Sequence, residues 1–371
     1  MVTSSTVRGS RLLTLLPALA LVAAGCASGE SDPGPTSSAP ESPADGGTAV
    51  VPAGSPADVT TDLAAPWSIA FVGETALISN RDDGDVWELT DDGSTRLVGT
   101  VDGVVHQGES GLLGLAVDDQ DRLYAYSTAD DGNRVQRFEL TGDPGSYGLG
   151  PVETILEGVP AASNHDGGRI AFGPDGMLYV ATGDANDRPA AQDLESLAGK
   201  ILRLTPDGAA PDDNPFPGSL VYSLGHRNPQ GIAWASDGTM FAAEFGQDRW
   251  DELNIVTAGS NYGWPAAEGI AGDDRFVDPV QQWEPDIASP SGIAVADGTV
   301  FIANLRGAVL RSVPVADPTT STDYFTGEHG RLRDVVVAPD GDLWFLTNNT
   351  DGRGDARGGD DRILRVGLEP A

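Results

Sequence analysis

The residue with the clearest chemical potential is a histidine in a glycine-rich loop. Residues 164–169 read Asn-His-Asp-Gly-Gly-Arg and precede an apolar segment that begins at Ile170. Paired glycines let a backbone approach a ligand closely, and a histidine in such a loop can titrate near neutral pH and act as a general base. A capped turn in which His165 packs on the glycines is the alternative.

A carboxylate, Asp184, ends the hairpin that follows this loop. A carboxylate that accepts a hydrogen bond from one imidazole nitrogen fixes the tautomer and raises the basicity of the other nitrogen. We therefore expect Asp184 to orient His165, although an Asp at the end of a strand is often only a turn former.

A third polar group precedes another apolar segment. Residues 225–231 read Gly-His-Arg-Asn-Pro-Gln-Gly, which is more polar than a turn requires. Arg227 is suited to a carboxylate or a developing oxyanion, and Asn228 and Gln230 lie beside it. We expect His226 to hold the loop through hydrogen bonds.

Oxygen ligands and cations gather further along the chain. Residues 244–265 intersperse carboxylates with glycines and turn residues, a composition that offers the oxygen ligands preferred by Ca²⁺, without the spacing of an EF-hand. A solvated acidic loop is the alternative.

Arg306, Arg331 and Arg333 stand out in a very acidic chain. Alternation in an extended segment points Arg331 and Arg333 to one side, where they could clamp a polyanionic small molecule, unless they form surface ion pairs.

These side chains lie at the ends of a repeated element. An apolar strand start, an Asp-Gly type turn, a second apolar strand and a polar tail recur in order, which predicts β-hairpins. The copies span residues 69–80, 115–128, 170–184, 232–246, 293–307 and 335–349. A period of roughly 40 to 60 residues is typical of sheets that bury their faces only against neighbouring copies. The sequence therefore predicts an all-β fold, a six-bladed β-propeller, which gathers distant loops around one axis.

The first residues indicate export. Arg8 and Arg11 precede an apolar run, and residues 23–26 read Ala-Ala-Gly-Cys, the shape of a lipoprotein signal peptide rather than a membrane span. We expect residues 1–25 to be that signal and Cys26, the only cysteine, to carry a lipid that anchors the protein outside the cytoplasmic membrane. Because Ala23 stands where lipoproteins usually have Leu, soluble secretion is the alternative.

The remaining chain divides into a tether and a domain. Residues 26–57 are rich in Ser, Pro, Gly and acidic residues and cannot form a core, so we expect a disordered tether before a propeller at 58–371. The net charge of −34 argues against binding of nucleic acid or of anionic membranes, because phosphate contacts need clustered Lys and Arg. Membrane contact is expected only through the lipid.

Together these segments resemble the glucose/sorbosone dehydrogenase family, six-bladed quinoproteins that use pyrroloquinoline quinone (PQQ) and Ca²⁺ to oxidise sugars. The matching stretches follow the family order and span nearly the whole propeller; they are residues 66–71, 111–114, 164–169, 199–203, 225–231, 251–254, 261–265 and 331–334.

The resemblance implies catalytic roles for three residues. His165 would take the proton of the anomeric hydroxyl, Asp184 would be its hydrogen-bonding partner, and Arg227 would lie beside the quinone oxygens. The PQQ-binding residues implied in this way are Gln107, Arg227, Asn228, Gln230, Arg306, Arg331 and Arg333. Arg306 stands where the family usually has Lys. Both Gln107 and Glu109 precede the Gly-Leu-Leu-Gly motif; Gln107 is preferred on chemistry.

The resemblance also implies two Ca²⁺ sites. The backbone carbonyls of Gly246 and Gln247 would bind the ion that polarises PQQ, and Glu252 and the carbonyl of Tyr262 would bind a structural ion. Gln247 replaces a Pro of better-known members, which a carbonyl ligand tolerates.

The function expected is oxidation of an aldose at the anomeric carbon to its lactone. Since the chain has no haem attachment motif, the electrons would pass to an external acceptor. Two alternatives remain. A calcium-dependent lactonase on the same fold would need a metal ringed by carboxylates and Asn, and a propeller without catalysis would serve as a binding module.

Overall fold

The computed structural model describes residues 47–371. The predicted signal peptide, Cys26 and residues 26–46 of the predicted tether lie outside this part. Within it, no helix is long and apolar enough to cross a membrane.

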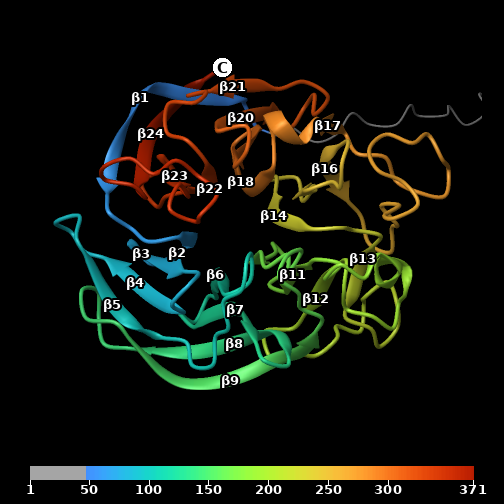
Figure 1. Ribbon diagram of the computed structural model, residues 1–371, viewed down its shortest axis with the longest axis horizontal. Helices are drawn as coiled ribbons and strands as arrows, with labels where there is room; N and C mark the ends of the chain where they lie inside the picture. The colour runs from blue at the N-terminus through green and yellow to red at the C-terminus, as the bar shows by residue number, and fades with distance from the viewer. Residues whose placement is uncertain (1–46) are drawn as a thin grey trace, which may run out of the picture. The chain divides into compact units, whose positions relative to one another are not determined.

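Six four-stranded sheets surround one axis, which confirms the predicted propeller (Figure 1). The first three blades consist of β2 (Pro66–Val72), β3 (Thr75–Asn80), β4 (Asp85–Leu89) and β5 (Thr95–Thr100); β6 (Leu112–Val117), β7 (Leu123–Ala129), β8 (Gly132–Thr141) and β9 (Gly148–Val159); and β10 (Ile170–Phe172), β11 (Leu178–Thr182), β12 (Lys200–Leu204) and β13 (Val221–Leu224). The last three consist of β14 (Pro229–Trp234), β15 (Met240–Glu244), β16 (Asp251–Val256) and β17 (Gln281–Trp283); β18 (Pro290–Ala296), β19 (Thr299–Asn304), β20 (Val309–Pro314) and β21 (Thr322–Tyr324); and β22 (Leu332–Val337), β23 (Leu343–Thr347), β24 (Ile363–Pro370) and β1 (Val50–Thr60). Two short 3₁₀ helices, η1 (Arg188–Gln192) and η2 (Pro285–Ile287), lie in loops.

The six predicted hairpins are the two inner strands of each blade. In the third blade, Ile170 pairs with Val180 and Phe172 with Leu178 across a short turn. The other hairpins, β2–β3, β6–β7, β14–β15, β18–β19 and β22–β23, have the same antiparallel order. The polar tails therefore follow the second strand of each blade and meet the loops that lead into the first.

The ring closes through the first strand of the domain. β1 is the outer strand of the sixth blade and pairs with β24, from Val50 opposite Pro370 to Thr60 opposite Ile363 (Figure 1, blue beside red). The predicted boundary between tether and domain at residue 57 is therefore wrong, because residues 50–57 are part of this sheet. Their small residues and prolines fit an outer strand that is only partly buried.

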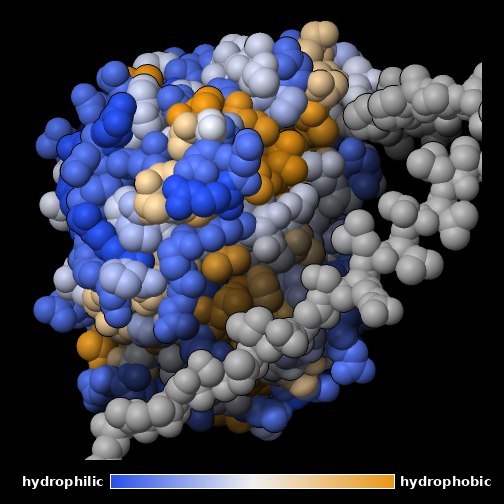
Figure 2. Space-filling view, turned by 90° about the vertical axis from the view of Figure 1, so that its right-hand side faces the viewer, coloured by the Kyte–Doolittle hydropathy of each residue, from blue (hydrophilic) through white to orange (hydrophobic). Residues whose placement is uncertain are grey.

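The core is divided into six apolar clusters, one between each pair of neighbouring blades. A single blade cannot bury both of its faces alone, so the clusters hold the ring together. Near the axis, the buried Arg169 donates to the buried Asp334 at 3.0 Å and to Ser68 at 3.1 Å, which links three blades. The side of the domain in Figure 2 is mainly hydrophilic, with smaller apolar patches.

Candidate active site

His165, Asp184 and Arg227 come together as one hydrogen-bonded group. His165 Nδ1 lies 2.8 Å from Asp184 Oδ1, and Nη2 of Arg227 lies 2.8 Å from His165 Nε2. The histidine precedes β10, the carboxylate follows β11, and the arginine precedes β14 in the next blade. The contact between His165 and Asp184 expected from the sequence is present.

The partners of His165 determine its tautomer. A guanidinium only donates hydrogen bonds and a carboxylate only accepts them. His165 Nδ1 must therefore carry a proton toward Asp184, while Nε2 must present a lone pair toward Arg227. This is the neutral imidazole with its basic nitrogen turned away from the carboxylate.

The backbone around His165 is closely packed. His165 has φ of +64°, a left-handed conformation that is uncommon for residues other than glycine. A Cβ at Gly183 would lie 1.7 Å from the carbonyl oxygen of His165. Glycine at 183 is therefore required for the hairpin tail to bring Asp184 under the histidine loop.

Burial and hydrogen bonds change the pKa values of Asp184 and Arg227. Although burial opposes ionisation of Asp184, hydrogen bonds from His165, Asn186 N and Trp264 hold its pKa below the usual value. Burial lowers the pKa of Arg227. Arg227 also donates to Gln247 Oε1 through Nε at 3.1 Å and to the carbonyl of Phe245 at 3.0 Å, so it stays anchored if its contact with His165 opens.

A cavity of about 460 Å³ lies beside this group. Its lining includes four predicted residues, Gln230, Arg306, Arg331 and Arg333, and also Trp67, Glu109, Phe245, Ser289, Leu305 and Arg353. Two of these lining residues, Glu109 and Phe245, connect the cavity to the His165–Asp184–Arg227 group. Glu109 accepts from His165 N at 3.2 Å, and the carbonyl of Phe245 accepts from Arg227.

Both members of the predicted arginine pair face this cavity. Arg333 donates to Gln230 Oε1 at 2.8 Å and to Asn348 Oδ1 at 3.0 Å, and Arg331 donates to the buried Asp351 at 3.1 Å. Burial lowers the pKa of Arg333 to about 9. The cavity thus holds guanidiniums that have lost much of their hydration, which an anionic ligand would stabilise.

The other predicted binding residues occupy different positions. Arg306 is exposed and lines the cavity. Asn228 is fully buried; its Oδ1 accepts from Gly167 N, and its Nδ2 has no partner within residues 47–371.

Gln107 and Glu109 lie in different hollows, and only Glu109 lines the arginine cavity. Gln107 lines a separate hollow with Ser110 and Ser163, whereas Glu109 lines the arginine cavity and lies 3.5 Å from Arg353. The loop turns between the two residues, where Ser110 Oγ accepts from Gln107 N. Such a turn cannot be read from spacing alone.

Five lining residues had no predicted role: Trp67, Phe245, Ser289, Leu305 and Arg353. Arg353 belongs to a Gly- and Asp-rich segment that looked like an ordinary surface loop. Trp67 lies under two cations, with Arg169 Cζ at 4.3 Å and Arg333 Cζ at 5.7 Å from a ring centroid. It lies in the apolar strand β2, where packing alone would explain a tryptophan.

The predicted Ca²⁺ ligands lie in two places. Gly246 N donates to Asp251 and Gln247 N to Glu268, so their loop is anchored through its N–H groups. Glu252 is buried, and burial together with the charge of Glu244 raises its pKa to about 8. The side chain of Tyr262 stacks on His226. Within residues 47–371, no three His, Cys, Asp or Glu side chains gather as a metal site.

His226 holds its loop, as expected. It is fully buried, with Nδ1 2.8 Å from Glu244 Oε2 and Nε2 2.8 Å from Ser223 Oγ. Both ring nitrogens are thus used by fixed protein partners.

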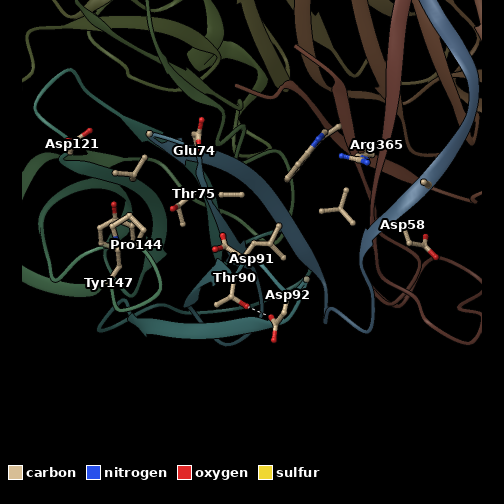
Figure 3. Close-up of a pocket in the computed structure, with 18 residues that line it drawn as sticks. Asp58, Glu74, Thr75, Thr90, Asp91, Asp92, Asp121, Pro144, Tyr147 and Arg365 are labelled. Carbon is tan, nitrogen blue, oxygen red and sulfur yellow. Dashed lines mark hydrogen bonds between the residues drawn. The ribbon is translucent and has the colours of Figure 1, made fainter. Parts of the chain in front are cut away.

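A larger cavity, about 870 Å³, lies elsewhere (Figure 3). Its lining includes Glu74, Asp91, Asp92 and Asp121, from turns at the opposite ends of the strands. It contains none of the predicted site residues. This cavity therefore lies on the opposite face of the propeller from the arginine cavity.

Comparisons with known proteins give the family of this chain. Residues 63–364 match the family model for glucose/sorbosone dehydrogenase. The aldose sugar dehydrogenase YliI of Escherichia coli K12 is 33% identical over 77% of this chain and 88% of its own length. Quinoprotein glucose dehydrogenase B of Acinetobacter calcoaceticus is 27% identical over 54% of this chain and 62% of its own. The PQQ-bound aldose sugar dehydrogenase of Streptomyces coelicolor is similar with 47% identity and a TM-score of 0.82, covering 86% of this chain and 98% of that one. From the family match and these relatives, we conclude that this chain belongs to the glucose/sorbosone dehydrogenase family.

Proposed function

We propose that this protein is a PQQ- and Ca²⁺-dependent aldose dehydrogenase that oxidises the anomeric carbon of a sugar to a lactone. The observation that carries the proposal is the His165–Asp184–Arg227 group beside a cavity lined by four arginines. Relatives named as aldose sugar dehydrogenases, one of them with PQQ bound, support it.

The protein residues divide the work of proton removal. His165 Nε2, the unprotonated nitrogen, takes the proton of the anomeric hydroxyl. Asp184 keeps the ring oriented and stabilises the imidazolium that forms. Arg227 yields its contact with His165 and holds position through Gln247 and Phe245, placing a positive charge where negative charge develops.

The cavity fits an anionic quinone. Arg306, Arg331, Arg333 and Arg353 would hold the carboxylates of PQQ. Asn228 Nδ2 and Arg331 Nε are both buried without partners in the described chain, and such groups favour a ligand that accepts their hydrogen bonds. When bound, PQQ would supply the acceptor for the hydride that leaves the anomeric carbon.

Two Ca²⁺ sites belong to the proposal. The carbonyls of Gly246 and Gln247 would bind the ion next to the quinone. Glu252 and the Tyr262 carbonyl would bind a structural ion. Asn254 Oδ1, which is buried without a partner, lies beside Glu252 in the same strand and supports a cation there.

The test is dye-linked oxidation of a panel of aldoses by the apo protein, with and without PQQ and Ca²⁺. We expect turnover only when both are added, with lactone as the first product. Turnover without PQQ, or PQQ binding with no aldose oxidised, would contradict the proposal.

The alternatives predict other outcomes. A lactonase would hydrolyse lactones without PQQ, and a binding module would show no turnover. The arginine cavity has no use in the lactonase, which needs carboxylates and Asn around a metal. Family membership also favours the dehydrogenase.

We further propose that the protein works outside the cytoplasmic membrane, anchored through a lipid on Cys26, and passes electrons to an external acceptor. The apolar run and the residues before Cys26 support the anchor; soluble secretion is the alternative. Mass spectrometry of the N-terminal peptide from membrane and culture fractions separates the two.

A further inference from the structure

Trp264 is in contact with two members of the histidine group. Its Nε1 donates to Asp184 Oδ2 at 2.9 Å. Arg227 Cζ lies 5.6 Å from the centroid of its ring, within the range of a cation–π contact. Trp264 is 6% exposed and does not line the arginine cavity.

The two oxygens of Asp184 have separate partners. Oδ1 lies against His165 Nδ1 and accepts from Asn186 N at 2.9 Å, whereas Oδ2 accepts from Trp264. A carboxylate with donors on both oxygens cannot rotate without breaking a charge-assisted hydrogen bond. Trp264 therefore determines which way Asp184 faces.

Trp264 is itself held from two sides. The backbone N–H of Trp264 donates to the carbonyl of Gly225, and the backbone carbonyl of Trp264 accepts from Gln192 Nε2 at 2.6 Å. Gln192 ends η1. The fully buried Lys200 donates to the carbonyls of Ala190 and Ala191 in η1 and of Ala198 after it. The backbone of Trp264 is thus held by the third blade, through Gly225 and Gln192.

We propose that Trp264 is a positioning residue for the reaction, which acts through Asp184 to hold His165 in the orientation and tautomer needed for proton removal. The inference rests on the proposed function. It assigns a role to the tryptophan of the Asn-Tyr-Gly-Trp segment that goes beyond packing: a hydrogen bond that crosses from one blade to the carboxylate of another.

The test compares Trp264→Phe with the parent protein. Phenylalanine keeps a ring against Arg227 and removes the N–H donor. We expect kcat to fall about 10-fold to 100-fold, as for other residues that orient a reacting group, while the KM for the aldose and the Kd of PQQ stay within about twofold. The matched control is Trp344→Phe, because Trp344 Nε1 is buried without a partner in the described chain and lies on the opposite face.

A double-mutant cycle separates positioning from general damage. If Trp264 acts through Asp184, Trp264→Phe has little further effect in an Asp184→Asn background. The inference would be overturned if the fold losses of kcat of Trp264→Phe and Asp184→Asn multiply in the double variant. A kcat of Trp264→Phe within twofold of the parent protein would also overturn it.

Two further measurements keep the test decisive. If Trp264→Phe does not fold, replacement of Trp264 by benzothienylalanine removes the N–H with almost no change of shape, and the same loss of kcat is expected. In the apo protein, the downfield proton resonance of His165 Nδ1 should move in this variant and not in Trp344→Phe; an unchanged resonance counts against the role. Should the parent protein bind PQQ and oxidise no aldose, the proposed function fails. Independent effects of Trp264→Phe and Asp184→Asn in an active protein reject only the role of Trp264.

Discussion

Two histidines occupy equivalent places in neighbouring blades and have different surroundings. His165 precedes β10 and bonds to Asp184 after β11, and His226 precedes β14 and bonds to Glu244 at the end of β15. Each ring lies 2.8 Å from its carboxylate. A histidine–carboxylate pair at this place therefore occurs in two blades and is not by itself a mark of catalysis.

The two histidines differ in what their Nε2 atoms contact. His226 Nε2 is 2.8 Å from the hydroxyl of Ser223, and the side chain has no exposure. The side chain of His165 is 11% exposed, and its Nε2 meets only Arg227, a cation that has other partners. A base needs a lone pair that substrate can reach, and only His165 presents one.

The largest effect expected from this comparison is on turnover. His165→Ala should lower kcat by about two to four orders of magnitude, because a positioned general base is lost. Binding of PQQ, measured by absorbance titration, should be nearly unchanged. Activity within a few-fold of the parent protein would remove His165 from the mechanism.

The opposite pattern is expected for the second histidine. His226→Ala should destabilise the domain by about 3 kcal/mol, because the buried Glu244 and Ser223 lose a partner. Urea unfolding measures this loss, and the kcat of the folded fraction should stay within a few-fold. A fall in kcat as large as that of His165→Ala, at unchanged stability, would abolish the distinction between the two pairs.

Substitutions of Asp184 and Glu244 should differ in the same way as those of the two histidines, with a smaller effect on kcat. Asp184→Asn should lower kcat about 10-fold to 100-fold, since the amide no longer favours the required tautomer. Glu244→Gln should leave kcat within a few-fold and lower the urea midpoint. Equal effects of the two substitutions on kcat would show that both pairs serve the reaction.

The smallest effect is a pH dependence of stability. The pKa of Asp184 is held below its usual value by hydrogen bonds from His165, Asn186 N and Trp264, despite burial. Its contribution to stability is therefore present above the unfolded pKa of about 3.9 and is lost as the pH falls through the lower folded value. The difference in unfolding free energy between the parent protein and Asp184→Asn should be constant from pH 5 to 7 and shrink below pH 4. A difference that shrinks already between pH 7 and 5 would contradict the assignment.

Features with a local cause could be predicted from the sequence. The hairpins follow from apolar runs around short turns, and the contact of His165 with Asp184 follows because one hairpin separates them. Alternation along an extended segment brought Arg331 and Arg333 to the same cavity. Each of these depends on a period or a turn that the sequence shows directly.

Features that depend on residues distant in the sequence could not be predicted in this way. β1 is a strand because β24 offers it an edge, and its own residues look like a tether. Glu109 rather than Gln107 faces the cavity because of a turn held by Ser110. Arg353 reaches the cavity from a Gly-rich segment across from Glu109, and Trp264 meets Asp184 from another blade.

The most direct test of the central claim is a single-turnover experiment on PQQ-loaded protein, with aldose and without an external acceptor. Absorbance of the bound cofactor would be followed in the parent protein, in His165→Ala and in His226→Ala. We predict rapid reduction in the parent protein and in folded His226→Ala, and reduction about two to four orders of magnitude slower in His165→Ala. Equal rates in His165→Ala and the parent protein would contradict the account.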